Sequence, residues 1–120
     1  MLNVNVDHIG DLAIVECDGT IVQNDAAFKL REVITSQRDA HTVVLDLSKV
    51  DAIEGGGLGM LMFLQRWTYD HDIRFKLFNP RRSVRERLKE VHSMLEFDIP
   101  ALDELMAVLA QADRRHAIAA

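Results

Sequence analysis

The chain has 120 residues, of which 48% are apolar, and its formal net charge is −5 at pH 7. This length suits one compact domain, and the acidic balance argues against nucleic-acid binding, which needs a basic surface to displace counterions from phosphates. A single cysteine excludes an internal disulfide, and the lack of a secretory signal or a stretch of ~20 apolar residues predicts a cytoplasmic protein without membrane insertion.

Alternating apolar and polar residues predict a β-hairpin at the start of the chain. Residues 2–6 alternate, Gly10-Asp11 interrupts the pattern, and the strand-like run Leu12–Cys17 follows. Asp18-Gly19 is expected to end the second strand. Cys17 fits this strand as a small buried hydrophobe rather than as a catalytic thiol.

A helix is predicted after the hairpin, with Asn24 or Asp25 as its cap. Its apolar face combines five positions at helical spacing, Ala26, Ala27, Leu30, Val33 and Ile34. Val43, Val44 and Leu45 then form the short continuous apolar run expected of a parallel strand that is covered on both faces.

The next predicted helix runs from Gly57 to about Asp70 and is apolar nearly all round its first two turns. One stripe gathers Leu58, Leu61, Met62, Gln65 and Tyr69, and the opposite stripe gathers Met60, Phe63 and Trp67. We expect the first stripe to fill the core. The second stripe is equally consistent with packing under a neighbouring helix and with a docking surface, because Trp, Phe and Met are enriched at binding centres.

The remaining elements follow in regular order. Residues 73–77 alternate as a strand, and Asn79-Pro80 is expected to cap and begin a helix with the buried stripe Val84, Leu88 and Val91. A short extended piece is expected over residues 95–99. Pro100 opens a last helix with the apolar face Leu102, Leu105, Met106 and Leu109. This order predicts an α/β fold, a mixed sheet of four to five strands with four helices packed on it, formed by residues 1–116 as one domain; residues 117–120 are expected to fray.

The stretch VVLDLSKVDAIEGGGLG, residues 43–59, leads from the buried strand through a tight turn into a helix that opens with glycines. It resembles the signature of the STAS domain family, which is shared by bacterial anti-sigma-factor antagonists and the tails of sulphate transporters. In those antagonists an apolar strand with Asp-Leu precedes Asp-Ser-Ser-Gly-Leu-Gly, and here Asp46-Leu47 precede residues 54–59. The resemblance covers almost the whole chain and implies the mixed STAS sheet.

The resemblance also implies a departure from the family. Residues 57–59 match the motif and Glu54 keeps the acid, but the serine that takes a phosphoryl group in the family falls on Gly55, and its neighbour falls on Gly56. Glycine has no oxygen to phosphorylate. The chain is therefore expected either to stay in the equivalent of the unphosphorylated, binding-competent state or to have left the sigma-factor circuit.

By resemblance the chain is a non-enzymatic domain that binds an anti-sigma factor or serine-kinase-like ATPase, and a homodimer is also open. The motif implies five docking residues: Glu54, Gly55, Gly56, Gly57 and Leu58. The helix pattern adds Met60 and Phe63, and Asp25, which follows the second strand, is added at the rim. Two other roles of small STAS proteins stay as alternatives, a subunit of a lipid-transport ABC complex and an oligomeric signalling scaffold.

Other chemistry finds little support in the residues. A glycine-rich turn can cradle phosphate, but no P-loop Lys and Ser follow, and the G-x-G-x-x-G spacing is absent. The five histidines lack a two-ligand spacing, so no metal or cofactor is expected, and no nucleophile elbow indicates catalysis. Ser48 and Thr20 are interpreted as turn or capping residues. Arg81, Arg82 and Arg85 form either a solvated face or a receptor for an acidic partner.

Overall fold

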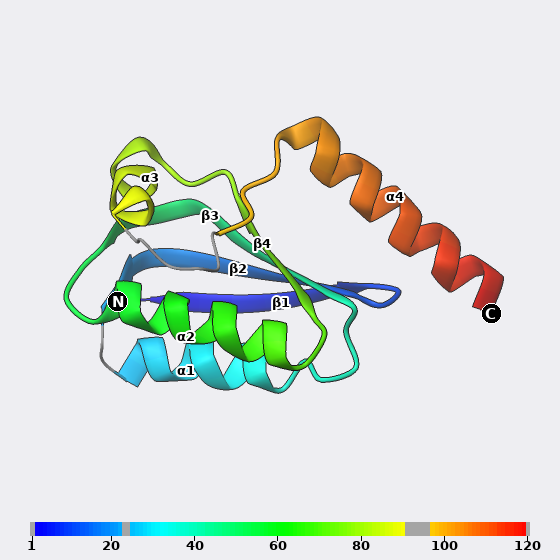
Figure 1. Ribbon diagram of the computed structural model, residues 1–120, viewed down its shortest axis with the longest axis horizontal. Helices are drawn as coiled ribbons and strands as arrows, with labels where there is room; N and C mark the ends of the chain where they lie inside the picture. The colour runs from blue at the N-terminus through cyan, green and yellow to red at the C-terminus, as the bar shows by residue number, and fades with distance from the viewer. Residues whose placement is uncertain (1, 23–24, 91–96, 120) are drawn as a thin grey trace.

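The computed structural model describes residues 2–22, 25–90 and 97–119, and confirms the predicted mixed α/β fold with four strands and four helices. In chain order the elements are β1 (Asn3–Ile9), β2 (Leu12–Ile21), α1 (Asp25–Thr35), β3 (Thr42–Ile53), α2 (Gly57–Asp70), β4 (Arg74–Phe78), α3 (Arg82–Lys89) and α4 (Leu102–Ala119). The sheet order is β1-β2-β3-β4 (Figure 1). β1 and β2 form the expected antiparallel hairpin, while β3 runs parallel to both β2 and β4.

The sheet has a different cover on each face. α1 and α2 lie side by side on one face and enclose the main core, which also receives side chains from α3 (Figure 1). On the other face α4 covers one end of the sheet, where Leu105 and Ala112 pack with Leu12 and Val44. Leu102 and Met106, predicted to be part of the buried face of α4, are instead 62% and 56% exposed. The buried face is rotated because the helix contacts the sheet along Leu105, Val108, Leu109 and Ala112.

β3 is the central strand and confirms the prediction of a parallel strand covered on both faces. Val43 and Leu45 face the main core, while Val44 faces the cluster under α4. All three side chains are at most 1% exposed. Burial of each is worth about 1.5–3 kcal/mol, so the strand that leads into the glycine-rich turn is firmly anchored.

β2 continues past its predicted end. Asp18-Gly19 lies within the strand, where the register with β3 shifts between Glu16 and Asp18 and again between Gly19 and Thr20. Gly19 has a φ of 126°. The Asp-Gly pair therefore marks a bulge-like irregularity instead of a turn, and β2 reaches Ile21.

The elements after β4 also differ in detail from the prediction. Asn79 has a φ of 51° and does not cap α3; the N-cap is Arg81, so the helix begins two residues later than expected. Within the extended piece predicted over residues 95–99, the described residues 97–99 form one parallel bridge, between Asp98 and Lys76. Residues 95 and 96, and Val91 of the predicted stripe, lie outside the described residues. The fraying of residues 117–120 stays a prediction.

β3 extends well beyond its neighbour β4, and α3 borders the part that projects. The pairing of β3 with β4 ends at Asp46, whereas β3 itself ends at Ile53. Three side chains of the α3 segment donate hydrogen bonds to carbonyls in the projecting part: Arg81 Nε to Ser48 O at 3.0 Å, Ser83 Oγ to Asp51 O at 3.2 Å and Arg87 Nε to Ile53 O at 3.4 Å. These carbonyls thereby find partners that β4 is too short to supply.

Candidate protein-docking surface

The turn between β3 and α2, residues Glu54–Gly57, is held against the end of β2 by its backbone; we call it the glycine turn. Glu54 N donates to Ile21 O at 2.9 Å, and Gly57 N donates to Glu54 O at 3.0 Å. Gly55 has a φ of 54°, a left-handed conformation that glycine adopts without the steric cost borne by other residues. Main-chain geometry alone therefore shapes the turn.

The glycines at this turn serve different purposes. A Cβ on Gly57 would lie 2.3 Å from Ile21 O, whereas a Cβ on Gly55 or Gly59 would meet no atom within 4 Å. Gly57 is thus a packing residue that lets α2 begin against the end of β2. The space above Gly55 and Gly59 is open, so atoms of another molecule can approach the main chain there.

The structure leaves most of the predicted docking residues accessible. Glu54 and Gly55 are exposed, Gly56 and Leu58 are half-buried, and Phe63 is 39% exposed. Two predicted residues are buried, Gly57 and Met60, so neither belongs to the surface and both are removed from the docking set. Asp25 is the first residue of α1, and its side chain lies outside the described residues.

The buried side of α2 runs between the two predicted stripes. It consists of Gly57, Met60, Leu61, Leu64 and Thr68, and so takes residues from both. Met62 and Tyr69, which were expected to fill the core, are 42% and 63% exposed. The contact of Gly57 with Ile21 fixes which side of the helix faces the sheet, and nothing in the apolar pattern of α2 reveals that contact.

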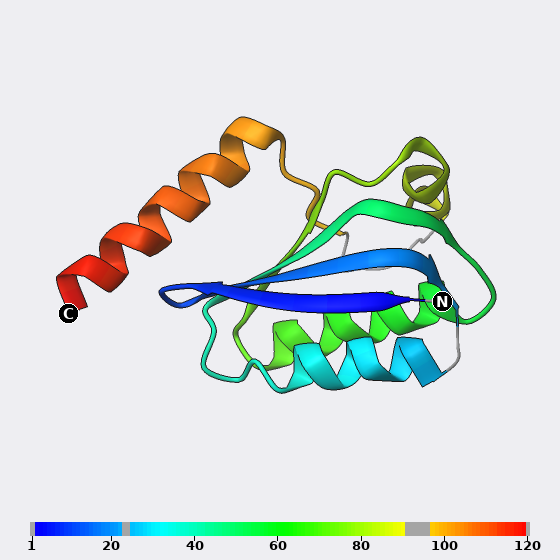
Figure 2. The ribbon, with the colours of Figure 1, turned by 180° about the vertical axis from the view of Figure 1, so that it is seen from behind.

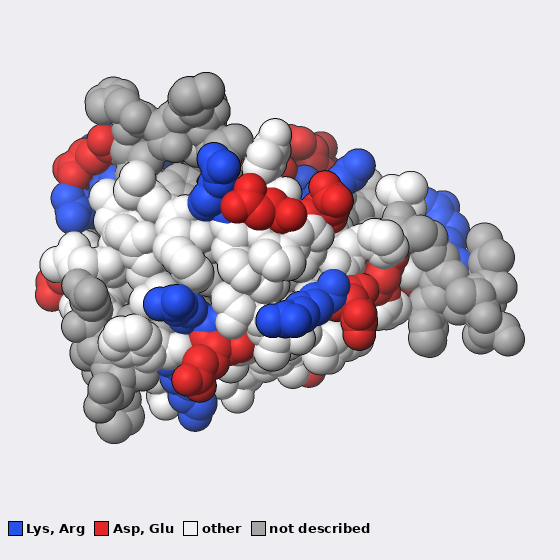
Figure 3. Space-filling view, turned by 60° about the horizontal axis from the view of Figure 1, so that its bottom comes forward, with Lys and Arg blue, Asp and Glu red and all other residues white. Residues whose placement is uncertain are grey.

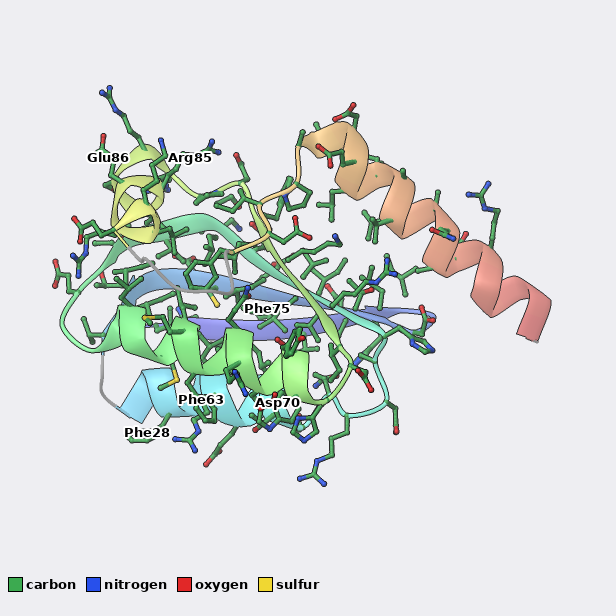
Figure 4. All side chains as sticks on the ribbon, viewed as in Figure 1. Phe28, Phe63, Asp70, Phe75, Arg85 and Glu86 are labelled. Atoms are coloured by element: carbon green, nitrogen blue, oxygen red, sulfur yellow. The ribbon has the colours of Figure 1, made fainter. Side chains whose placement is uncertain are left out.

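Apolar side chains extend the accessible surface from the glycine turn onto the helices. Phe28 on α1 and Met62 and Phe63 on α2 are 47%, 42% and 39% exposed. Phe28 and Phe63 lie on adjacent helices (Figure 4), and the Arg31 guanidinium lies 4.3 Å from the centroid of the Phe63 ring. Figure 3 shows an uncharged area bordered by charged groups on the side of the molecule where α1 and α2 lie. We call Phe28, Met62 and Phe63 the α1–α2 surface.

Sequence reasoning missed two residues of this surface. Met62 was assigned to the core, and Phe28 lies off the predicted apolar face of α1. The spacing of positions 59, 62, 63 and 66 could have revealed Met62, because it places Met62 and Phe63 on one side of α2 together with Gly59 and the charged Arg66. Trp67, expected on the outer stripe, is half-buried and stacks on His71 with ring centroids 4.1 Å apart.

Three of the other candidate polar residues are engaged within the molecule. Arg81 Nη1 lies 2.8 Å from Asp51 Oδ1, and Arg82 Nε lies 3.3 Å from Glu86 Oε1. Ser48 Oγ donates to Asp46 Oδ1 at 2.7 Å. Ser48 and Thr20, expected in turns or caps, lie instead within β3 and β2, because both strands run past their predicted ends. That the arginines receive an acidic partner stays a prediction.

Cys17 confirms the prediction of a small buried hydrophobe. The residue is 2% exposed, and burial, with a further contribution from Asp46, raises the pKa of its thiol to about 12. A thiol in this state is a poor nucleophile at neutral pH. Among the described residues, no three His, Cys, Asp or Glu side chains gather as metal ligands, and no helix is both long and apolar enough to cross a bilayer.

Comparison with known proteins places this geometry in a family context. The family model described as STAS domain matches residues 3–101, and no curated protein matches the chain. SpoIIAA, an anti-sigma factor antagonist in its unphosphorylated form, matches with a TM-score of 0.73 and 13% identity over 91% of this chain and 97% of that one. An anti-sigma factor antagonist from Mycobacterium paratuberculosis matches with a TM-score of 0.71 and 19% identity over 92% and 95%.

A transporter shares the fold as well. The murine anion transporter Slc26a9 in its inward-facing state matches with a TM-score of 0.70 and 16% identity. The match covers 88% of this chain and 18% of the transporter. At these identities the three structures show that the fold is shared, both by small antagonists of similar length and by one part of a much larger protein.

Proposed function

Because the chain belongs to the STAS domain family, we propose that it is a non-enzymatic protein-binding domain of the anti-sigma-factor-antagonist type, which docks an anti-sigma factor kinase through the glycine turn. The observation that carries the proposal is the bare main chain at Gly55, which is exposed and has open space above it. Two of the similar structures are anti-sigma factor antagonists of nearly the same extent, which supports an anti-sigma factor as the partner; that this partner is a kinase follows the resemblance of the motif.

The proposed contact area combines the turn with the α1–α2 surface. Glu54, Gly55, Gly56 and Leu58 supply mostly main chain and one carboxylate, and the α1–α2 surface supplies three large apolar side chains. Apolar groups at the centre of an interface bury favourably, while a single charge at the rim adds direction at small desolvation cost. Glu54 is therefore suited to a basic group of the partner.

We propose further that phosphorylation at the turn does not control this docking. A phosphoryl group at a helix start carries about two negative charges and would repel a partner seated there. Gly55 and Gly56 offer no hydroxyl oxygen. Gly55→Ser supplies one, so mass spectrometry after incubation with the kinase should find phosphate on the variant alone; equal labelling of the natural chain would contradict the proposal.

The docking site is tested by calorimetry with a purified anti-sigma factor kinase from the same genome. Gly55→Asp places a charge inside the proposed interface, and we expect a dissociation constant at least about tenfold larger. Gly10→Asp is the matched control, because Gly10 has a φ of 58° against 54° for Gly55, so the backbone strain introduced by aspartate is similar. Gly10 lies in the β1–β2 turn, at the opposite end of the sheet from the glycine turn (Figure 1).

Two results would contradict the proposal. If Gly55→Asp and Gly10→Asp bind the kinase equally well, the glycine turn is not the docking site. If the natural chain does not bind the kinase and instead copurifies with a transporter ATPase, the role of a transport-complex subunit replaces that of an antagonist.

A further inference from the structure

β1 is an edge strand whose outer side is covered by no other described element. The sheet order places β2 on one side of β1 and no strand on the other. Figure 2 shows β1 at the front of the molecule, with no helix crossing it. The outward N–H and C=O groups of such a strand form a ready template for pairing with another strand.

The opposite edge of the sheet is closed. β4 has only five residues, Leu77 N donates to Asp98 O at 2.8 Å, and Lys76 Nζ lies 2.7 Å from the Asp98 carboxylate. β1 has seven residues, pairs with β2 in an unbroken register and contains no lysine, proline or bulge. Short length, lysine and cover are among the usual means of blocking edge pairing, and they are present at β4 but not at β1, whose one acidic residue is Asp7.

We infer that two copies of this chain pair antiparallel through β1 and join their sheets into one continuous sheet. The symmetric register centred on Val6 gives every residue of the strand a partner. Val6 faces Val6 of the second copy, Asn5 faces its Asp7, Val4 faces its His8 and Asn3 faces its Ile9. The occupant of the open edge is thus the same strand from a second molecule.

This register is self-complementary in side chains and in charge. Val4 and Val6 pack toward the main core, and the symmetric pairing keeps them on the face covered by α1 and α2 in both copies. Asp7 stands opposite Asn5, whose amide can donate to the carboxylate. A register centred on Asp7 would set the two carboxylates against each other, so charge favours the register centred on Val6.

The paired arrangement keeps the glycine turns of the two copies apart. The amino end of β1 lies beside the carboxyl end of β2, where Ile21 contacts the glycine turn. Antiparallel pairing therefore sends the two glycine turns to opposite ends of the joined sheet. The inference does not depend on the proposed function, because it requires no molecule other than the chain itself.

Sedimentation equilibrium of the full chain tests the pairing. Between about 1 µM and about 1 mM, the mass should rise from the monomer value of 13.6 kDa toward twice that value. Asn5→Asp sets a carboxylate against Asp7 of the second copy twice in each dimer, and should raise the dimer dissociation constant about 2- to 30-fold. Asn3→Asp is the matched control, because within one chain Asn3 and Asn5 face the acidic β2 residues Asp18 and Glu16.

Two further variants test the register. Adding Asp7→Lys to Asn5→Asp places opposite charges face to face and should restore the natural dissociation constant. Val6→Cys sets two thiols at the symmetry axis, so mild oxidation should give a covalent dimer, and the buried natural Cys17 does not compete. A chain that stays monomeric at every concentration, equal weakening by Asn3→Asp and Asn5→Asp, or failure of both the rescue and the cross-link overturns the inference.

Discussion

Replacing Gly57 with alanine should destabilise the protein far more than the same change two residues later. The new Cβ would lie 2.3 Å from Ile21 O and 2.9 Å from Ile21 C, and both atoms belong to the main chain at the end of β2. Restoring ordinary contact requires a shift of about 1 Å, and overpacking of this kind costs about 1–3 kcal/mol. The blocking group is backbone, so we take the upper value; alanine recovers up to about 1 kcal/mol of helix propensity, which leaves a net loss of about 2 kcal/mol.

Gly59→Ala is the matched control for this prediction. Its Cβ would meet no atom within 4 Å, and the residue lies inside α2, so the change should raise the free energy of unfolding by about 0.5–1 kcal/mol. Gly55→Ala meets no atom either, but its φ of 54° should cost about 1 kcal/mol. Urea unfolding followed by circular dichroism gives all three values, provided that the dependence on urea concentration is unchanged. If Gly57→Ala and Gly59→Ala were equally stable, the packing role of Gly57 would be refuted.

Three more predictions concern a buried thiol, a surface ion pair and the two sides of α2. The folded-state pKa of Cys17 is raised from 9.0 to about 12, so the contribution of its neutral thiol to stability is complete below pH 9 and is lost between pH 9 and 12. Urea unfolding across that range should show no such loss of stability for Cys17→Ala. If the variant kept the pH dependence of the natural chain, the assignment of this loss to Cys17 would be wrong. Arg81→Ala should lower the free energy of unfolding by about 1 kcal/mol, because it removes the bonds of Arg81 to β3. Arg82→Ala loses only a partner on its own helix and should change the free energy of unfolding by less than about 0.5 kcal/mol. Equal effects of the two variants would contradict the stabilising role of the α3–β3 contact. Met60→Ala should cost about 2–4 kcal/mol in thermal or urea unfolding without a specific effect on kinase binding. Phe63→Ala should weaken kinase binding with little effect on stability. If both variants changed stability and binding in the same way, the assignment of the two faces of α2 would be wrong.

The sequence pattern predicted the secondary-structure elements that are determined by residues close together in the chain. The hairpin follows from alternation around Gly10, and the doubly covered strand follows from the run Val43–Leu45; both are confirmed. The prediction that Asp18-Gly19 ends the second strand was wrong. An Asp-Gly pair favours a turn but also fits a strand irregularity, and only the pairing of β2 with β3 distinguishes the two.

The bare turn was predictable from the glycines and its detail only in part, while its docking role stays a proposal. The glycines indicated a bare turn, and Gly55 is exposed, but the sequence did not distinguish the open space at Gly55 from the crowded contact at Gly57. That contact sets the rotation of α2, so the assignment of Met60 to the outer side and of Met62 to the core was reversed. Rotation of an all-apolar helix is decided by a tertiary contact, which periodicity does not encode.

The projecting end of β3 gives the side chains of α3 a role in positioning. Where a strand runs past one of its neighbours, the carbonyls on that side lose their strand partners and would otherwise bond only to water. Here Arg81, Ser83 and Arg87 donate to three carbonyls near the end of β3, and these bonds add to the pairing with β2 that holds the final residues of the strand. The position of the glycine turn therefore depends in part on side chains from a helix that comes much later in the chain. A change at Arg81, Ser83 or Arg87 can shift the turn without replacing any of its residues.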